Sequence, residues 1–158
     1  MQLSPGGKKR TWMMAASDSS SGNRGGFVFP APPEYIPEWA EREANSWTGL
    51  DEFEILVRAE EITGKRIEIT CSLLPESTWG FHIVKGHRAG IFLNRRLPDQ
   101  WKRFALFHEL YHLLEHRKGE SFWRRTATPL SSFEHQADLF AWAVALKEWE
   151  ICWKESSL

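Results

Sequence analysis

Apolar residues recur at helical spacing in the stretch that follows residue 49. They are Leu50, Phe53, Leu56 and Val57, and Gly64 comes after the last of these turns. The pattern predicts one amphipathic helix that ends at Gly64, because glycine adopts the left-handed conformation of a helix C terminus at little cost. Glutamates are frequent between residues 34 and 61, and we interpret them as the solvated side of this helical region.

Between residues 65 and 95 the apolar residues alternate with other residues. A period of two is typical of strands whose two faces differ, so this stretch predicts three short strands. Glycines separate the strands, and a turn at residues 85–88 is expected to join the second to the third. The apolar positions are Ile67 and Ile69 in the first strand, Trp79, Phe81 and Ile83 in the second, and Ile91 and Leu93 in the third.

Two more helices are predicted in the second half of the chain. Pro98 suits a first helical turn, and the helix it begins is expected to run to His116. A loop is then expected over residues 117–130, followed by a helix that begins at Ser131 or Ser132. This order of elements predicts an α+β fold with a small, mainly antiparallel sheet.

The first 33 residues differ in composition from the rest. They are rich in glycine, serine and proline and hold few apolar residues. Such a segment buries too little surface to fold alone, so residues 1–33 are predicted to be a flexible tail, or a segment that docks on a partner, and residues 34–158 one domain. A length of 158 residues with 42% hydrophobic residues fits that single domain.

Charge and cysteine content exclude several classes of protein. A net charge of -1 gives no general attraction to nucleic acid or to anionic membranes, so neither is expected as a partner. The longest apolar run, Leu139–Leu146, is too short to span a bilayer. Cys71 and Cys152 are too few for a disulfide framework or a four-cysteine zinc site. With no secretory signal pattern at the amino terminus, a cytoplasmic protein is predicted.

The sequence His-Glu-Leu-Tyr-His at residues 108–112 is an H-E-x-x-H motif within a predicted helix. His108 and His112 are about 6 Å apart along the helix axis and about 40° apart around it, so their imidazoles can bind one ion. Glu109 is then placed to reach a water at that ion. About 0.02 chance matches are expected in a chain of this composition, so the motif predicts a zinc hydrolase.

A catalytic zinc ion needs a third protein ligand. His116 lies two helical turns, about 12 Å, beyond the first motif histidine and cannot reach the same ion. Glu134, 22 residues after the second motif histidine, is the best remaining candidate, although Ser131 and Glu134 also have the spacing of a helix-capping box. Asp138 is one turn further on and is expected to accept the second N–H of a ligating histidine.

Three anchors in this order resemble the ImmA/IrrE family of zinc metallopeptidases. They are the strand ending in Asn94, the H-E-x-x-H helix and the sequence E-x-x-A-D-x-F-A at residues 134–141, and the similarity covers most of residues 50–146. The resemblance implies that His108, His112 and Glu134 bind Zn²⁺, one ion per chain, and that Glu109 is the catalytic base.

The same resemblance implies a zincin-like domain of the gluzincin type, in which the sheet packs against the two metal-binding helices. The implied function is that of an endopeptidase that cleaves a helix-turn-helix transcriptional repressor of a mobile element or stress regulon. The alternative is a non-catalytic zinc-binding module that inhibits a repressor or toxin by binding. We expect the substrate to lie along an edge strand near Ile91–Asn94, with His82, Tyr111 or backbone groups stabilising the oxyanion.

Overall fold

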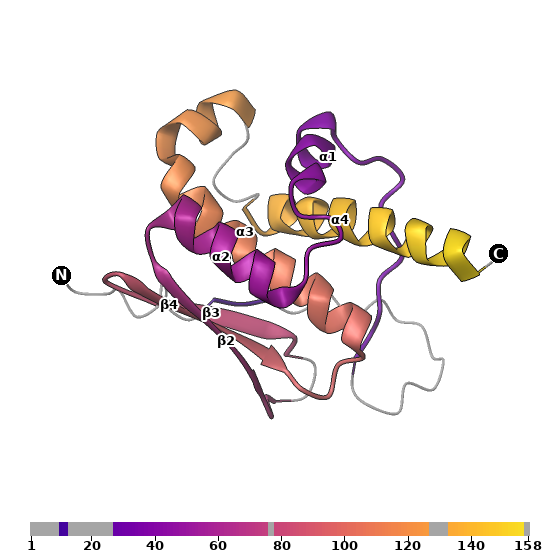
Figure 1. Cartoon of the computed structure of the whole chain (residues 1–158), viewed down its shortest axis with the longest axis horizontal. Helices are drawn as coiled ribbons and strands as arrows, with labels where there is room; N and C mark the ends of the chain where they lie inside the picture. Colours follow the sequence, from indigo (N-terminus) through magenta and orange to yellow (C-terminus); the bar gives the residue numbers. More distant parts are fainter. Residues whose placement is uncertain (1–9, 13–26, 76–77, 127–132, 157–158) are drawn as a thin grey trace.

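The computed structural model describes residues 10–12, 27–75, 78–126 and 133–156, which form a mixed α+β fold as the sequence predicts (Figure 1). The elements, in chain order, are β1 (Arg10–Trp12), α1 (Glu38–Asn45), α2 (Glu52–Thr63), β2 (Arg66–Ser72), β3 (Gly80–Lys85), β4 (Arg88–Asn94), α3 (Asp99–Thr126) and α4 (Phe133–Ser156).

The described strands form one sheet in the order β1-β3-β4-β2. β3 pairs antiparallel with both β1 and β4, whereas β2 and β4 are parallel, so the sheet is mainly antiparallel, as predicted. β4 therefore lies inside the sheet, and the expectation of an edge strand near Ile91–Asn94 is wrong. Alternating residues mark a strand but not its neighbours, because strand order depends on pairing between distant segments.

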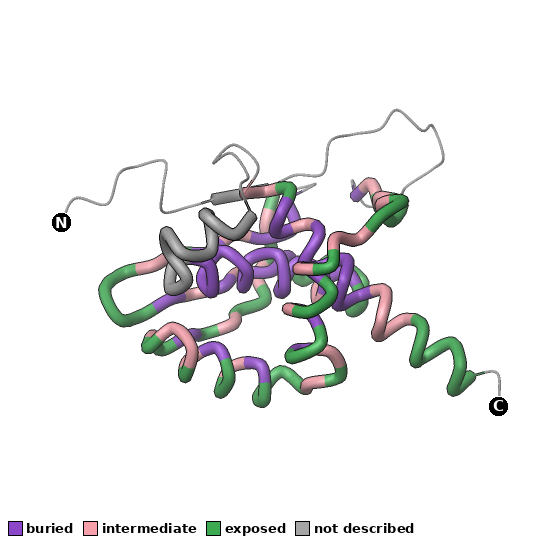
Figure 2. The backbone as a smooth tube through the Cα atoms, turned by 90° about the horizontal axis from the view of Figure 1, so that it is seen from above, coloured by how far each residue is buried: buried purple, intermediate pink, exposed green. Residues whose placement is uncertain are grey.

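α3 lies at the centre of the layered structure. One side of α3 packs against the sheet and another against α4, while α1 covers part of α4 (Figure 1). The last turns of α4 extend away from the other elements, and Ile151 and Trp153 are exposed there (Figure 2). Among the described helices, none combines the length and apolar content needed to cross a bilayer.

The predicted helix before Gly64 is confirmed as α2. The Asp51 side chain accepts a hydrogen bond from the Glu54 amide at 2.8 Å, and the Glu54 carboxylate accepts one from the Asp51 amide at 2.9 Å. Gly64 has a φ of 69° and ends the helix. α1, which the apolar pattern did not indicate, buries only the small side chains of Ala40 and Ala44.

α3 is longer than the sequence indicated. It continues through residues 117–126, so the predicted loop is wrong over that range. The stretch has no proline, and its one glycine, Gly119, costs a helix only about 1 kcal/mol. Ser131 and Ser132, the predicted start of the last helix, lie outside the described residues, and α4 is described from Phe133.

A cluster of aromatic rings joins the sheet to α3 and α4. Trp101 contacts both Trp79 and Trp142 edge to face, with ring centroids 5.4 and 5.7 Å apart. Phe27 is buried and packs edge to face on Trp79, and Phe29 stacks on Trp101 at 5.1 Å. The packed part of the described chain thus includes residues N-terminal to the predicted boundary at residue 34.

Candidate metal centre

The H-E-x-x-H motif lies on the most enclosed part of α3. His108 and Glu109 are 0% exposed and His112 is 8% exposed, because the sheet covers α3 on one side and α4 on the other. Buried polar groups lose their hydration and need protein partners or a bound ion in its place. The partners of this motif come from α4 and β3.

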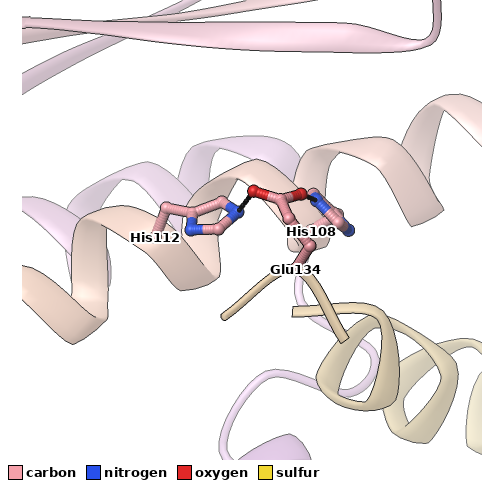
Figure 3. Close-up of side chains that lie close together, drawn as sticks. All are labelled: His108, His112 and Glu134. Atoms are coloured by element: carbon pink, nitrogen blue, oxygen red, sulfur yellow. Dashed lines mark hydrogen bonds and ion pairs between the residues drawn. The ribbon is translucent and has the colours of Figure 1, made fainter. Parts of the chain in front are cut away.

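The first residues of α4 bring Glu134 between the two histidines (Figure 3). Its Oε2 lies 2.9 Å from His108 Nε2, and its Oε1 lies 3.1 Å from His112 Nε2. The potential ligand atoms of the three residues all lie within 4.8 Å of one another. The structure thus brings together the three residues that the sequence suggested as metal ligands.

Asp138, one turn further along α4, reaches the other nitrogen of His108. Its Oδ1 lies 2.8 Å from His108 Nδ1, which donates the hydrogen bond to this carboxylate. This contact fixes the orientation of the ring, so that Nε2 faces Glu134. His135, between the two acidic residues, is exposed, as its place on the helix indicates.

The close charges change the proton affinity of each group. Burial alone lowers the pKa of His108, but hydrogen bonds to Asp138 and Glu134 outweigh burial and raise it to about 9. For His112 burial prevails, and its pKa lies below 6.5. The two imidazoles outweigh burial at Glu134 and hold the pKa of its carboxyl well below its usual range.

These residues fit a bound metal ion. Two imidazole nitrogens and one carboxylate oxygen form a donor set that suits zinc and other first-row transition metals. His112 Nε2 is buried, and its 3.1 Å contact with Glu134 Oε1 lacks hydrogen-bond geometry, so a bound ion would supply the partner that this nitrogen needs. We conclude that the arrangement of His108, His112 and Glu134 suits one metal ion.

The other residues that the sequence singled out differ in their surroundings. Tyr111 is buried and its hydroxyl donates a hydrogen bond to Gln136 Oε1 at 3.0 Å. His82 is in contact with Glu109, with 2.5 Å between Nδ1 and Oε2. The side chain of His116 lies outside the described residues, and so does Ser131, the capping partner considered for Glu134.

The inward position of His82 follows from strand alternation, which the apolar residues of β3 did not reveal. Phe81 and Ile83 made the second strand recognisable, yet Gly80 and His82 are the buried residues of β3 and Ile83 is exposed. Phe81 instead stacks on Phe92 at 4.7 Å. Strand alternation places Gly80 and His82 on one face, but only the packing of α3 decides that this face is buried.

The chain also matches a known protein family. The IrrE N-terminal-like domain, peptidase family M78, matches residues 52–151, which is more than half of the chain. The chain belongs to this family. No curated protein and no solved structure matches this chain. Membership confirms the resemblance drawn from the sequence and indicates a peptidase, and the His108, His112 and Glu134 cluster indicates a metal.

Substitutions on α4 of this IrrE N-terminal-like domain should distinguish the roles of Glu134 and Asp138. Glu134→Gln removes a charged ligand and should abolish most of the affinity for Zn²⁺, used here as the probe. Asp138→Asn should weaken binding about 10- to 100-fold, the usual effect of losing the partner of a ligating histidine. Chelator competition measures both, with His135→Asn as the exposed control. Retained affinity with a lower melting temperature in Glu134→Gln would identify a helix-capping residue instead.

Metal binding by the IrrE N-terminal-like domain should depend on pH over an unusual range. The pKa of His108 is raised to about 9 in the metal-free protein, so below this pH a metal ion must displace a proton from His108. Zn²⁺ affinity should therefore fall about tenfold per pH unit below 9 and level off above it. Competition with a chelator from pH 6 to 10 measures this slope. A constant affinity between pH 7 and 9 would contradict the raised pKa.

Proposed function

We propose that this protein is a zinc-dependent endopeptidase with a zincin-like active site of the gluzincin type. In this proposal His108, His112 and Glu134 hold the zinc ion and Glu109 is the catalytic base. The observation that carries the proposal is the buried Glu109 carboxylate next to the three-residue metal cluster. Family membership supports the same reaction class.

We take zinc as the metal, because an H-E-x-x-H motif with a third carboxylate ligand is a pattern of zinc hydrolases. When bound, zinc supplies a Lewis acid that polarises a carbonyl group and acidifies water. His108 is oriented by Asp138, and Glu134 would offset part of the charge of the ion. Three protein ligands are the pattern of catalytic rather than structural zinc sites.

Glu109 has the features required of a general base. Its Oε2 is held by His82, while its Oε1 is buried and has no hydrogen-bond partner among the described residues. We infer that Glu109 accepts a proton from the water whose oxygen attacks the peptide carbonyl. As the carbon–nitrogen bond breaks, Glu109 transfers that proton to the leaving amine.

The proposed substrate is a helix-turn-helix transcriptional repressor, cleaved to release a mobile element or a stress regulon from repression. This part of the proposal rests on the family resemblance. The competing function is a non-catalytic zinc-binding module that inhibits a repressor or toxin by binding. A buried carboxylate oxygen without a partner is costly, and binding alone has no use for it, so Glu109 favours catalysis.

The side of β3 that β1 occupies is the best place for an extended substrate. β3 carries His82 next to Glu109, and a strand added at this edge would lie along the catalytic residues. β1 already pairs there, with Arg10 opposite His82 and Trp12 opposite Gly80. We infer that residues 10–12 and the substrate compete for the same backbone groups of β3.

Replacing the catalytic base should separate hydrolysis from binding. Glu109→Gln preserves the size of the side chain and both histidines, so zinc content and repressor binding should persist. Loss of the base should slow cleavage about 10²- to 10⁴-fold. The assays are gel analysis of a co-expressed helix-turn-helix repressor encoded beside the gene, and hydrolysis of a pool of internally quenched peptides. Glu61→Gln on the exposed side of α2 is the matched control. Equal relief of repression by wild type and Glu109→Gln would establish the binding function.

Removing β1 should expose the proposed substrate edge. A chain that starts at Met13 lacks β1, whereas a chain that starts at Arg10 retains it and is the matched control. Three cross-strand pairs at roughly 0.2–1 kcal/mol each total about 0.6–3 kcal/mol, so KM should fall about 3- to 150-fold in the shorter chain while kcat stays constant. Steady-state cleavage of the best peptide of the pool measures both constants. Identical KM values in the two chains would exclude competition at this edge.

A further inference from the structure

One buried imidazole in the site belongs neither to the H-E-x-x-H motif nor to the three-residue metal cluster. His82 comes from β3 and is 6% exposed. Its Nδ1 lies 2.5 Å from Glu109 Oε2. Its ring also stacks on that of His112, with centroids 5.2 Å apart and 22° between the planes. The imidazole is therefore held against both the base and one metal-binding histidine.

The contact with Glu109 determines which atoms carry hydrogen. A carboxylate can only accept a hydrogen bond, so Nδ1 of His82 carries a proton and donates a hydrogen bond to Oε2. A glutamate has three rotatable side-chain bonds, and fixing them costs up to about 2 kcal/mol of conformational entropy. His82 holds one oxygen of the carboxylate in place. The other oxygen, Oε1, is buried and has no hydrogen-bond partner among the described residues.

β3 is shaped to bring His82 to this position. Gly80 precedes His82 on the same face of the strand, and a Cβ atom at Gly80 would lie 2.7 Å from the carbonyl oxygen of Phe92 and 3.8 Å from Cγ of Glu109. A side chain at position 80 would clash with this backbone carbonyl of the neighbouring strand β4, whereas its distance to Glu109 is an ordinary van der Waals contact. The strand therefore passes close over Glu109, and its next inward side chain reaches the carboxylate.

We propose that His82 is a positioning residue for the catalytic base. It holds Glu109 Oε2 so that Oε1 is the atom that receives the proton from the attacking water. This inference rests on the proposed peptidase function, since a base needs a fixed orientation only if it transfers a proton. Misplacement of a reacting group by about 1 Å can cost about 100-fold in rate.

Two substitutions of His82 test this role in the full-length zinc-loaded protein. His82→Leu removes the donor, whereas His82→Asn keeps an N–H close to the position of Nδ1. With the best-cleaved internally quenched peptide as the probe, kcat should fall about 10- to 100-fold in His82→Leu with KM within about twofold of wild type. His82→Asn should recover most of that loss. Zinc content should stay at wild-type level in both variants.

The control is His87→Leu, which removes an exposed imidazole from the turn between β3 and β4 and should leave kcat unchanged. The role would be overturned if His82→Leu kept the wild-type kcat, or if His82→Asn lost as much activity as His82→Leu. A merely structural histidine would change the melting temperature of both variants and would not give recovery by asparagine.

A second measurement does not depend on peptide cleavage. In protein labelled with ¹⁵N-histidine, the His82 ring should be the tautomer protonated at Nδ1, with a downfield N–H proton resonance. Glu109→Ala should move that resonance upfield, because the acceptor is lost, whereas Glu61→Ala should not. If wild type cleaves no peptide and this signature is present, the peptidase proposal fails and the His82–Glu109 contact stands. A His82 ring protonated only at Nε2 in wild type would overturn the inference.

Discussion

The burial of a polar helix face is the constraint on which the rest of this structure depends. α3 lies between the sheet and α4, and its H-E-x-x-H segment carries two imidazoles and a carboxylate into the interior. Each of these groups needs a partner in place of water. α4 provides Glu134 and Asp138 for His108, and β3 provides His82 for Glu109. The elements that pack on α3 therefore also supply the polar partners that the site needs.

Contacts away from the site keep α4 in register with α3. Arg103 on α3 forms two hydrogen bonds of 2.7 Å with the carboxylate of Glu148 on α4 and also donates to the Leu50 carbonyl at 2.5 Å. Paired bonds of this kind fix direction as well as distance. At the same end of the helix pair, Trp101 packs edge to face on Trp142. Together these contacts set where α4 lies on α3, and so where its first turn places the acidic residues.

Local signals in the sequence were sufficient for the features that depend on neighbouring residues. Helix periodicity and Gly64 predicted the extent of α2, and the spacing of His108 and His112 placed both imidazoles on one helix face. Glu134 was ambiguous at this level, because a capping residue and a metal ligand can have the same local sequence. The distances from Glu134 to both histidines depend on how α4 packs on α3, and residue spacing does not predict them.

The fold class, the family and the motif residues could be predicted from the sequence alone, because periodicity and motif spacing are encoded within a few turns of chain. The position of β4 inside the sheet, the pairing of residues 10–12 with β3 and the contact between His82 and Glu109 emerged only from the folded chain. Each of these joins segments far apart in the chain. An alternating strand has two faces and two edges, and the face that is buried and the edge that is paired depend on what packs against it.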